Sequence, residues 1–470
     1  MEFALIRNNP LGLRQGGGSS SPIETKPIPM FFANDEPNLQ NVACYCAHNK
    51  VTVNVDNAYS HDEFDFSDTH HFDQKNKYKS TSFLTVPLLN HDDDVIGVLQ
   101  LINAKHQQTR EVIPFSDDLI PVVEALSTYA SIALNNQILV EDLKSLLDAF
   151  IKCIARAIDA KSPHTSGHCE RVPLLTELIA QAACDDQFEL KDFSLDSDGW
   201  YELKVASWLH DCGKLSTPDS VLEKSTKLHL MRDGVHELNA RFQTIKLQYR
   251  LEAAEGRLSQ TQLREKLVQL EADRLFISQA NKGSEFMSQE DKSRVQGIAQ
   301  YRWQNADGQD LPLLTEVEIY NLCIERGTLT SEEREVINNH MVVTIDMLES
   351  LPFPRKLRRV PEYAGGHHEK MDGSGFPKGL TREQMSLPAR MMAIADIFEA
   401  LTAKDRPYKD PMKISQALGI MSRMRDNNHI DPDIFQLFLR ANVWQQYAEQ
   451  VLNPAQIDIS NADEFMLVSV

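Results

Sequence analysis

The chain has 470 residues, of which 42% are hydrophobic and 25% are charged, so it is long enough to bury more than one globular core. Its 68 acidic and 48 basic residues give a formal net charge of −20. This surplus of negative charge repels polyanions and argues against DNA or a long RNA as a partner. A small phosphate ester remains compatible with the composition, because a local pocket can override the field of the whole surface.

The sequence contains no apolar run long enough to cross a membrane, and its first 30 residues lack a signal-peptide pattern. The seven cysteines form neither paired C-x-x-C motifs nor a compact disulfide framework. These features predict a cytoplasmic chain with reduced thiols and no membrane segment. Cys44 and Cys46 are expected in a core rather than at a metal ion.

Residues 1–116 are predicted to form a domain with short strands. Its clearest signal is the segment SFLTVPLLNHDDDVIGVLQLINA, in which two apolar runs flank the polar turn NHDDD. This pattern predicts a β-hairpin inside a mixed sheet.

From residue 117 to about residue 160 the pattern becomes helical, and one set of positions recurs at alternating steps of three and four. The set comprises Leu119, Val122, Leu126, Tyr129, Ala133, Asn136, Val140, Leu143, Leu147, Phe150 and Ile154. Such a heptad predicts a parallel coiled coil and a homodimer, with Asn136 as the polar residue that sets the register. The alternative is one long helix packed on its own domain.

Residues 161–425 are predicted to be helical and to carry the chemistry. Within them, residues 228–310 are richer in Gln, Glu, Arg and Lys and have spaced leucines, a pattern typical of an inserted helical hairpin. Residues 426–470 have a few apolar helical positions and form the predicted C-terminal tail.

The segment YELKVASWLHDCGK predicts a partly buried helix that Gly213 can end. His210 and Asp211 therefore lie near the interior end of this helix. A buried carboxylate is costly unless a cation compensates its charge, and a salt bridge to Lys214 is one way to achieve that.

Other helices are also predicted to point histidine and aspartate side chains inward. These residues are His168, His340, His367, His368 and Asp396. A capping box from Thr330 to Glu333 opens the helix of His340. Pro388 can start the helix of Asp396, where the aspartate is expected to be the only charge in the apolar core. So many inward groups are hard to satisfy in pairs, whereas a shared metal centre satisfies them together.

The donor set is imidazole and carboxylate without thiolate, which suits iron, manganese or zinc with open coordination positions. The set is too large for one ion that must also bind a substrate, whereas Asp211 can bridge two ions with its two oxygens. The sequence therefore predicts at least a dinuclear centre.

In chain order, the motifs HTSGHCERV, HDCGKLSTPDSVL, HHEKMDGSGFPKGL and ADIFEALTAKDRPYK, with His340 between the second and third, resemble those of the HD-GYP family. That family comprises bacterial cyclic-di-GMP phosphodiesterases of the HD superfamily. The resemblance spans most of residues 145–425 and implies an all-α bundle. It carries the family's metal ligands onto His168, His210, Asp211, His340, His367, His368 and Asp396.

The resemblance also implies the reaction, which is hydrolysis of cyclic-di-GMP to pGpG and onward to GMP. Lys214 matches a lysine near the scissile phosphate, and Arg406 with Lys409 matches contacts to the substrate phosphates. His164 holds the position at which some members place a ligand for a third ion. The implied cofactors are two divalent ions, iron or manganese, with a third ion if His164 also binds metal.

Two features depart from the family pattern. Gly375, Phe376 and Pro377 stand where the family has Gly-Tyr-Pro, which keeps the ring and the turn of this substrate-site motif but loses a hydroxyl. The insertion at 228–310 is also outside the pattern. Two alternatives stay open: cyclic GMP-AMP as the substrate, and a non-catalytic cyclic-dinucleotide sensor. The complete set of ligand types, together with Lys214, favours the enzyme.

The segment FDFSDTHHFDQKNKYKSTSFLTVPLLNHDDDVIGVLQLINA resembles part of a GAF domain, which implies a sensor with an unidentified small-molecule ligand. The match weakens toward the start of the chain, so a truncated first helix is expected. The predicted fold class is α+β: a mixed α/β GAF-like domain at 1–116, a signalling helix at 117–160, an all-α HD-GYP bundle at 161–425 with its helical insertion, and a helical tail at 426–470.

Overall fold

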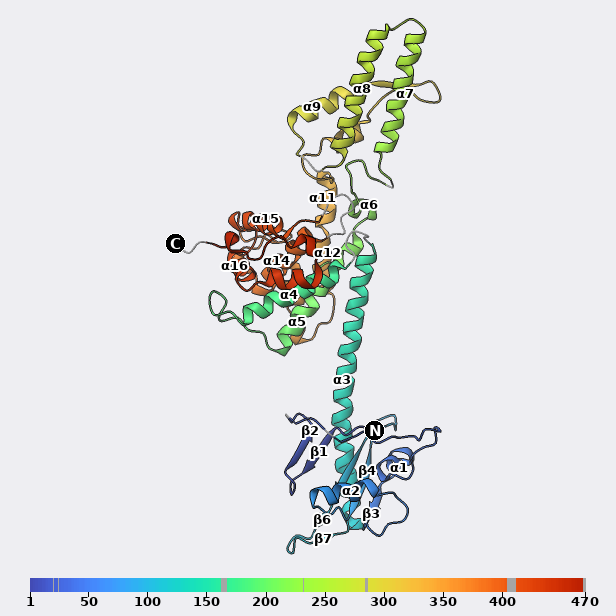
Figure 1. Cartoon of the computed structure of the whole chain (residues 1–470), viewed down its shortest axis with the longest axis vertical. Helices are drawn as coiled ribbons and strands as arrows, with labels where there is room; N and C mark the ends of the chain where they lie inside the picture. Colours follow the sequence, from blue (N-terminus) through green and yellow to red (C-terminus); the bar gives the residue numbers. More distant parts are fainter. Residues whose placement is uncertain are drawn as a thin grey trace. The chain divides into compact units, whose positions relative to one another are not determined.

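The computed structural model describes residues 1–19, 21–23, 25–161, 167–230, 232–283, 286–403 and 411–467 (Figure 1). The chain divides into two compact units, Met1–Leu147 and Asp148–Val470. Among the described residues, no helix has the length and hydrophobicity that a transmembrane span requires. The predicted α+β class is confirmed, because the strands of the first unit contrast with the helical second unit.

The first unit contains a three-stranded antiparallel sheet in the order β3–β4–β5. The strands are β3 (Val53–Val55), β4 (Phe83–Leu89) and β5 (Val95–Ile102). Strand β4 pairs with β5 from Phe83 opposite Ile102 to Leu89 opposite Val95, which confirms the predicted hairpin. The expected mixed sheet was wrong, because every strand pair in the described part of the chain is antiparallel.

The alternation of side chains along β4 gives this sheet two apolar faces. Phe83 packs on one face with Val42 of α1 (Val42–Asn49), and Leu84 packs on the other face with Phe115. Cys44 and Cys46 of α1 are fully buried, as the sequence predicted for core residues. The remaining elements of this part are β1 (Leu5–Asn8), β2 (Leu13–Gly16), α2 (Ser67–Asn76), β6 (Ala104–Lys105), β7 (Val112–Ile113) and η1 (Asp117–Leu119).

A single helix of 42 residues, α3 (Ile120–Lys161), contributes residues to both units. In the first unit it buries Ser127 and Ser131. The predicted heptad positions lie elsewhere on the helix and are exposed in this single chain from Val122 to Leu143. They are Val122, Leu126, Tyr129, Ala133, Asn136, Val140 and Leu143.

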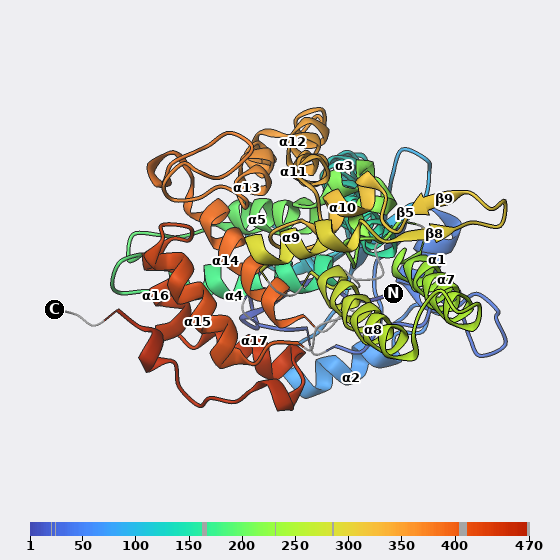
Figure 2. The same ribbon diagram turned by 90° about the horizontal axis from the view of Figure 1, so that it is seen from above.

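The core of the second unit is a bundle in which α4 contacts both α5 and α14 (Figure 2). Helix α13 contacts α5, α12 and α14. The bounds are α4 (His168–Cys184), α5 (Ser197–Leu209), η2 (Cys212–Ser216), α6 (Asp219–Leu222), α12 (His340–Glu349), η3 (Arg355–Leu357), α13 (Val360–Gly365), η4 (Arg382–Gln384) and α14 (Leu387–Thr402). Asp196 caps α5 by accepting from the Gly199 amide, and Pro388 lies in the first turn of α14, as expected.

The helix expected around His340 is two helices. Helix α11 (Ser331–Asn338) opens with the predicted capping box of Thr330 and Glu333. It ends before Asn339, and α12 begins at His340. The sequence pattern is continuous across this break, so helical periodicity alone could not locate it.

The inserted segment has a hydrophobic core of its own. It contains the predicted helical hairpin and a short β-hairpin, with bounds α7 (Val235–Ala254), α8 (Gln260–Asn281), α9 (Gln289–Ile298), β8 (Arg302–Gln304), β9 (Asp310–Pro312) and α10 (Glu316–Leu322). At its base, Lys224 pairs with Glu333 at 2.7 Å. The buried Lys227 donates to the carbonyl oxygens of Leu322 and Ile324, which ties together the two chain segments that bound the insertion.

The C-terminal segment is packed rather than peripheral. It forms α15 (Ile414–Asp426), α16 (Pro432–Arg440), α17 (Val443–Val451), η5 (Pro454–Gln456) and η6 (Asp463–Phe465). Trp444 and Tyr447 are fully buried, and the rings of Phe438 and Tyr447 meet Phe398 of α14 edge-on, with centroids 5.0 and 5.9 Å away. This segment therefore supports the helix that also carries Asp396.

Candidate metal centre

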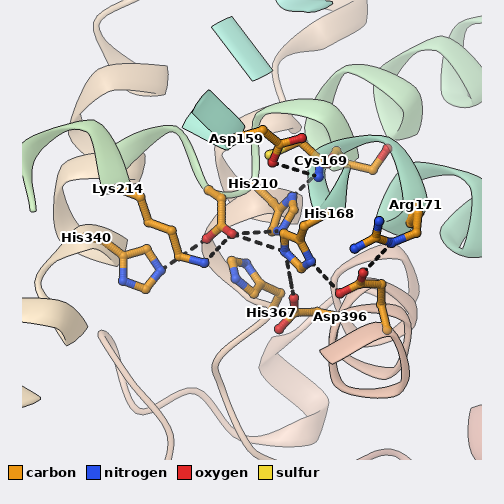
Figure 3. A network of polar contacts seen from close by, with 12 residues as sticks. Asp159, His168, Cys169, Arg171, His210, Lys214, His340, His367 and Asp396 are labelled. Carbon is orange, nitrogen blue, oxygen red and sulfur yellow. Dashed lines mark hydrogen bonds and ion pairs between the residues drawn. The ribbon is translucent and has the colours of Figure 1, made fainter. Parts of the chain in front are cut away.

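Two groups of side chains in the helical bundle can each hold a metal ion. One is His168, His210 and Asp211, and the other is His340, His367 and His368. Within each group the ligand atoms lie within 4.8 Å of one another. The six residues come from helix ends far apart in the sequence, which the bundle brings together. Figure 3 labels four of them, His168, His210, His340 and His367.

The first group gathers around the start of α4 and the end of α5. The His168 Nε2 atom lies 3.3 Å from Asp211 Oδ2 and 3.3 Å from Asp396 Oδ1. The His210 Nε2 atom lies 3.3 Å from the same nitrogen of His168. Asp396 projects into this group from the middle of α14, so three helices supply it.

Asp211 connects the two groups. Its Oδ2 atom faces His168 and His210, whereas its Oδ1 atom lies 3.4 Å from His340 Nε2. The side chain is almost completely buried. A carboxylate placed in this way can bridge two ions with its two oxygens.

The donors fit a metal, because three of the histidines use their other ring nitrogen on the backbone. The Nδ1 atoms of His210, His340 and His367 lie 2.8, 2.5 and 2.7 Å from the carbonyl oxygen three residues earlier. A carbonyl only accepts, so each Nδ1 carries a proton, and each ring turns its Nε2 atom toward the centre. His340 Nε2, His367 Nε2 and Asp211 Oδ1 are buried without a hydrogen-bond partner in the described chain.

Burial and neighbouring charges set the ionisation of these groups. Burial lowers the pKa of His368 to about 4 and that of His367 well below its ordinary value. Burial would raise the pKa of Asp211, but the charges of Lys214 and His210 hold it well below its usual range. The neutral imidazoles of His367 and His368 and the ionised carboxylate of Asp211 are thus in the forms that bind a divalent ion.

Glycine permits the close contact between the two groups. A Cβ atom on Gly213 would lie 2.0 Å from the carbonyl oxygen of His340, and the Gly213 amide donates to the Thr344 hydroxyl at 2.9 Å. Any side chain here would push the turn that follows Asp211 away from α12. This contact explains the glycine in the HDCGK motif.

Lys214 and the segment from Gly375 to Pro377 lie beside the two groups. The Lys214 ammonium is 2.5 Å from Asp211 Oδ2. The ring of Phe376 stacks on His368 with centroids 4.8 Å apart and an interplanar angle of 16°. Gly375 is needed for a close approach, because its Cβ would lie 2.4 Å from the Cα of Glu369.

The structure thus brings together His168, His210, Asp211, Lys214, His340, His367, His368, Phe376 and Asp396, all of which the sequence singled out. Three further predicted residues, His164, Arg406 and Lys409, lie outside the described residues.

Sequence reasoning missed two residues beside this centre, Glu399 and Arg171. The expectation that Asp396 is the only charge in the core of α14 was wrong, because Glu399 on the same helix is only 1% exposed. Glu399 follows Asp396 by three residues, so both carboxylates lie on one face of the helix. This spacing is the feature of the sequence that could have identified Glu399.

Comparisons with known proteins agree with the division of the chain into two units. A family profile described as HD domain matches residues 314–434, and one described as GAF domain matches residues 20–134. A "3'3'-cGAMP-specific phosphodiesterase 3" of Vibrio cholerae is 29% identical over 301 residues, which cover 63% of this chain and 40% of that protein. The chain therefore spans well under two thirds of this relative.

Two shorter matches have higher identity. A "Cyclic di-GMP phosphodiesterase" of Pseudomonas aeruginosa is 45% identical over 115 residues, covering 24% of this chain and 27% of that protein. A "3'3'-cGAMP-specific phosphodiesterase 1" of Vibrio cholerae is 42% identical over 88 residues, covering 19% of this chain and 20% of that protein.

Proposed function

We propose that this chain, which combines a GAF domain with an HD domain of the HD-GYP type, is a metal-dependent phosphodiesterase of cyclic dinucleotides. The observation that carries the proposal is the position of Asp211 between two groups of histidines whose Nε2 atoms face one centre. A site that only binds a nucleotide has no need of this arrangement. The relatives named as phosphodiesterases support the same reaction class.

The proposed metal-binding residues form two sets that share one carboxylate. His168, His210 and Asp396 with Asp211 would hold one ion, and His340, His367 and His368 with Asp211 would hold the other. The nitrogen and oxygen donors suit iron or manganese. When bound, two such ions polarise a phosphodiester and supply hydroxide at neutral pH. His164 is the proposed ligand of a third ion.

The chain's own residues bind and orient the substrate. Lys214 retains partial access to solvent and can offset the charge that develops on the phosphoryl oxygens. Arg406 and Lys409 are the proposed contacts to the substrate phosphates. The Gly375, Phe376 and Pro377 segment would line the substrate site, with the Phe376 ring packed against His368.

Cyclic-di-GMP is the first candidate substrate, with pGpG and then GMP as products. It is favoured by the relative with 45% identity. A specific observation favours 3'3'-cyclic GMP-AMP as a second candidate: the match to the relative named for that nucleotide extends over 63% of this chain. Turnover of both nucleotides by the purified, metal-analysed protein decides between them. Absence of turnover at full metal content would instead support the non-catalytic sensor.

The first 116 residues are the proposed sensor domain, residues 117–160 the proposed signalling helix, and residues 161–425 the proposed catalytic domain. A small molecule bound to the GAF domain would favour one arrangement of the helix, and α3 would pass that bias to the catalytic domain. The proposed assembly is a parallel homodimer whose seam is α3, in the cytoplasm. The exposed heptad positions of α3 support this assembly.

A further inference from the structure

One carboxylate next to the metal centre is bonded at both of its oxygens. The Glu399 Oε2 atom lies 2.6 Å from His168 Nδ1, and Oε1 accepts from the Nε–H of Arg171 at 2.6 Å. The side chain is buried, and its ion pair with Arg171 compensates the charge of the carboxylate. Glu399 therefore joins Arg171 to His168 from outside the centre.

His168 differs in this respect from the histidines whose Nδ1 atoms face backbone carbonyls. Its Nδ1 faces a charged side chain, while its Nε2 points to Asp211 and Asp396. A hydrogen bond to an ionised acceptor is stronger than one to a carbonyl and makes the imidazole a more basic ligand. The orientation of His168 thus depends on a side chain from α14 rather than on its own helix.

The C-terminal segment holds this pair in place. Tyr447 of α17 is fully buried and packs on Phe398, the neighbour of Glu399. The Gln456 side chain donates to the carbonyl of Thr402, where α14 ends.

From these contacts we infer that Glu399 and Arg171 form a positioning pair that orients His168 and strengthens metal binding, with α17 as its support. The inference rests on the proposed function only in treating His168 as a metal ligand. It assigns a role to the C-terminal segment, of which the HD-domain match covers only the part up to residue 434.

Titration of the metal-free protein with Mn²⁺ tests this role. Glu399→Gln keeps the size of the side chain and removes its charge, so we expect Mn²⁺ affinity to fall about 10- to 100-fold. Glu202→Gln is the matched control, because Glu202 is also a buried carboxylate of the bundle but accepts from the backbone amide of Arg359. The control should bind Mn²⁺ with the affinity of the wild type.

The activity of Glu399→Gln separates positioning from simple unfolding. Excess Mn²⁺ should restore most of its kcat without changing KM for the cyclic dinucleotide, whereas a misfolded bundle would not recover. If Glu399→Gln does not fold, Arg171→Gln tests the same pair and should also weaken Mn²⁺ binding. Unchanged Mn²⁺ affinity in a folded variant of either residue would overturn the inference.

The same titration distinguishes this inference from the proposed function. A wild type that binds Mn²⁺ but hydrolyses no cyclic dinucleotide removes the proposed activity, and the inference is then decided by the affinity ratio of Glu399→Gln to the wild type. A wild type that binds neither Mn²⁺ nor Fe²⁺ removes both.

Discussion

The heptad of α3 gives the sharpest test of the proposed dimer. Leu126 and Leu143 occupy heptad positions and are 62% and 66% exposed in the single chain. Replacing both with glutamate should separate the protomers, because a parallel seam would bury these side chains and cannot accommodate unpaired charges.

The expected effect follows from the exposed area. Full burial of a leucine contributes about 1.5–3 kcal/mol, so burying the exposed two thirds contributes ~1–2 kcal/mol for each side chain. Two leucines from each protomer then contribute ~4–8 kcal/mol. Since about 1.4 kcal/mol is a tenfold change in affinity, the dissociation constant should rise at least ~10³-fold.

Sedimentation velocity at micromolar concentration measures this change. The matched control is the pair Leu134→Glu and Ile138→Glu, because these leucine and isoleucine side chains are 39% and 37% exposed but lie off the heptad positions. The control should remain dimeric. A monomeric wild type, or a dimer that survives the Leu126 and Leu143 changes, would refute the coiled-coil seam.

Three further predictions concern the catalytic unit and its insertion. Asp211→Ala should lower the metal content and abolish hydrolysis. The control Asp186→Asn, which changes a buried aspartate paired with Arg440, should retain metal. Full metal content and wild-type turnover in Asp211→Ala would exclude the two-ion centre. Phe376→Tyr should change kcat by about tenfold or less, since only one hydrogen bond of about 1 kcal/mol is added, and a change of several orders of magnitude in steady-state kinetics would contradict this. Burial lowers the pKa of Lys227 from 10.5 to about 8, so the folded insertion binds fewer protons than the unfolded chain between these values. Its stability against local opening, measured by hydrogen exchange of α10, should therefore rise from pH 8 to 10.5 and lose this slope in Lys227→Met. A wild type without this slope, or with a slope of the opposite sign, would show that folding does not lower the pKa of Lys227.

Much of the centre could be predicted from the sequence, because its residues are polar groups in apolar helical surroundings. His210 and Asp211 follow an apolar helix, and Asp396 interrupts another. Burial of such groups is costly, so their presence is itself a signal of shared compensation. The same reasoning missed Glu399, because one further carboxylate at the end of an amphipathic helix is compatible with exposure to solvent.

The local sequence pattern could not distinguish structures that have the same hydrophobic periodicity. The break between α11 and α12 at Asn339 leaves the hydrophobic spacing unchanged. The residues of one strand also do not show whether it pairs parallel or antiparallel with its neighbour. The C-terminal segment has ordinary amphipathic helices, so nothing in its sequence indicated that Tyr447 packs on Phe398, the neighbour of Glu399.

The sequence by itself determined which histidine and aspartate residues turn inward, the hairpin of β4 and β5, and the helical character of residues 117–160. These properties depend on side-chain chemistry and on neighbours a few residues apart. Only the tertiary structure decided that the two oxygens of Asp211 face different histidine groups, and that Glu399 directs the ring of His168. Such contacts join residues that are as many as 231 positions apart, and they depend on how helices pack rather than on any local pattern.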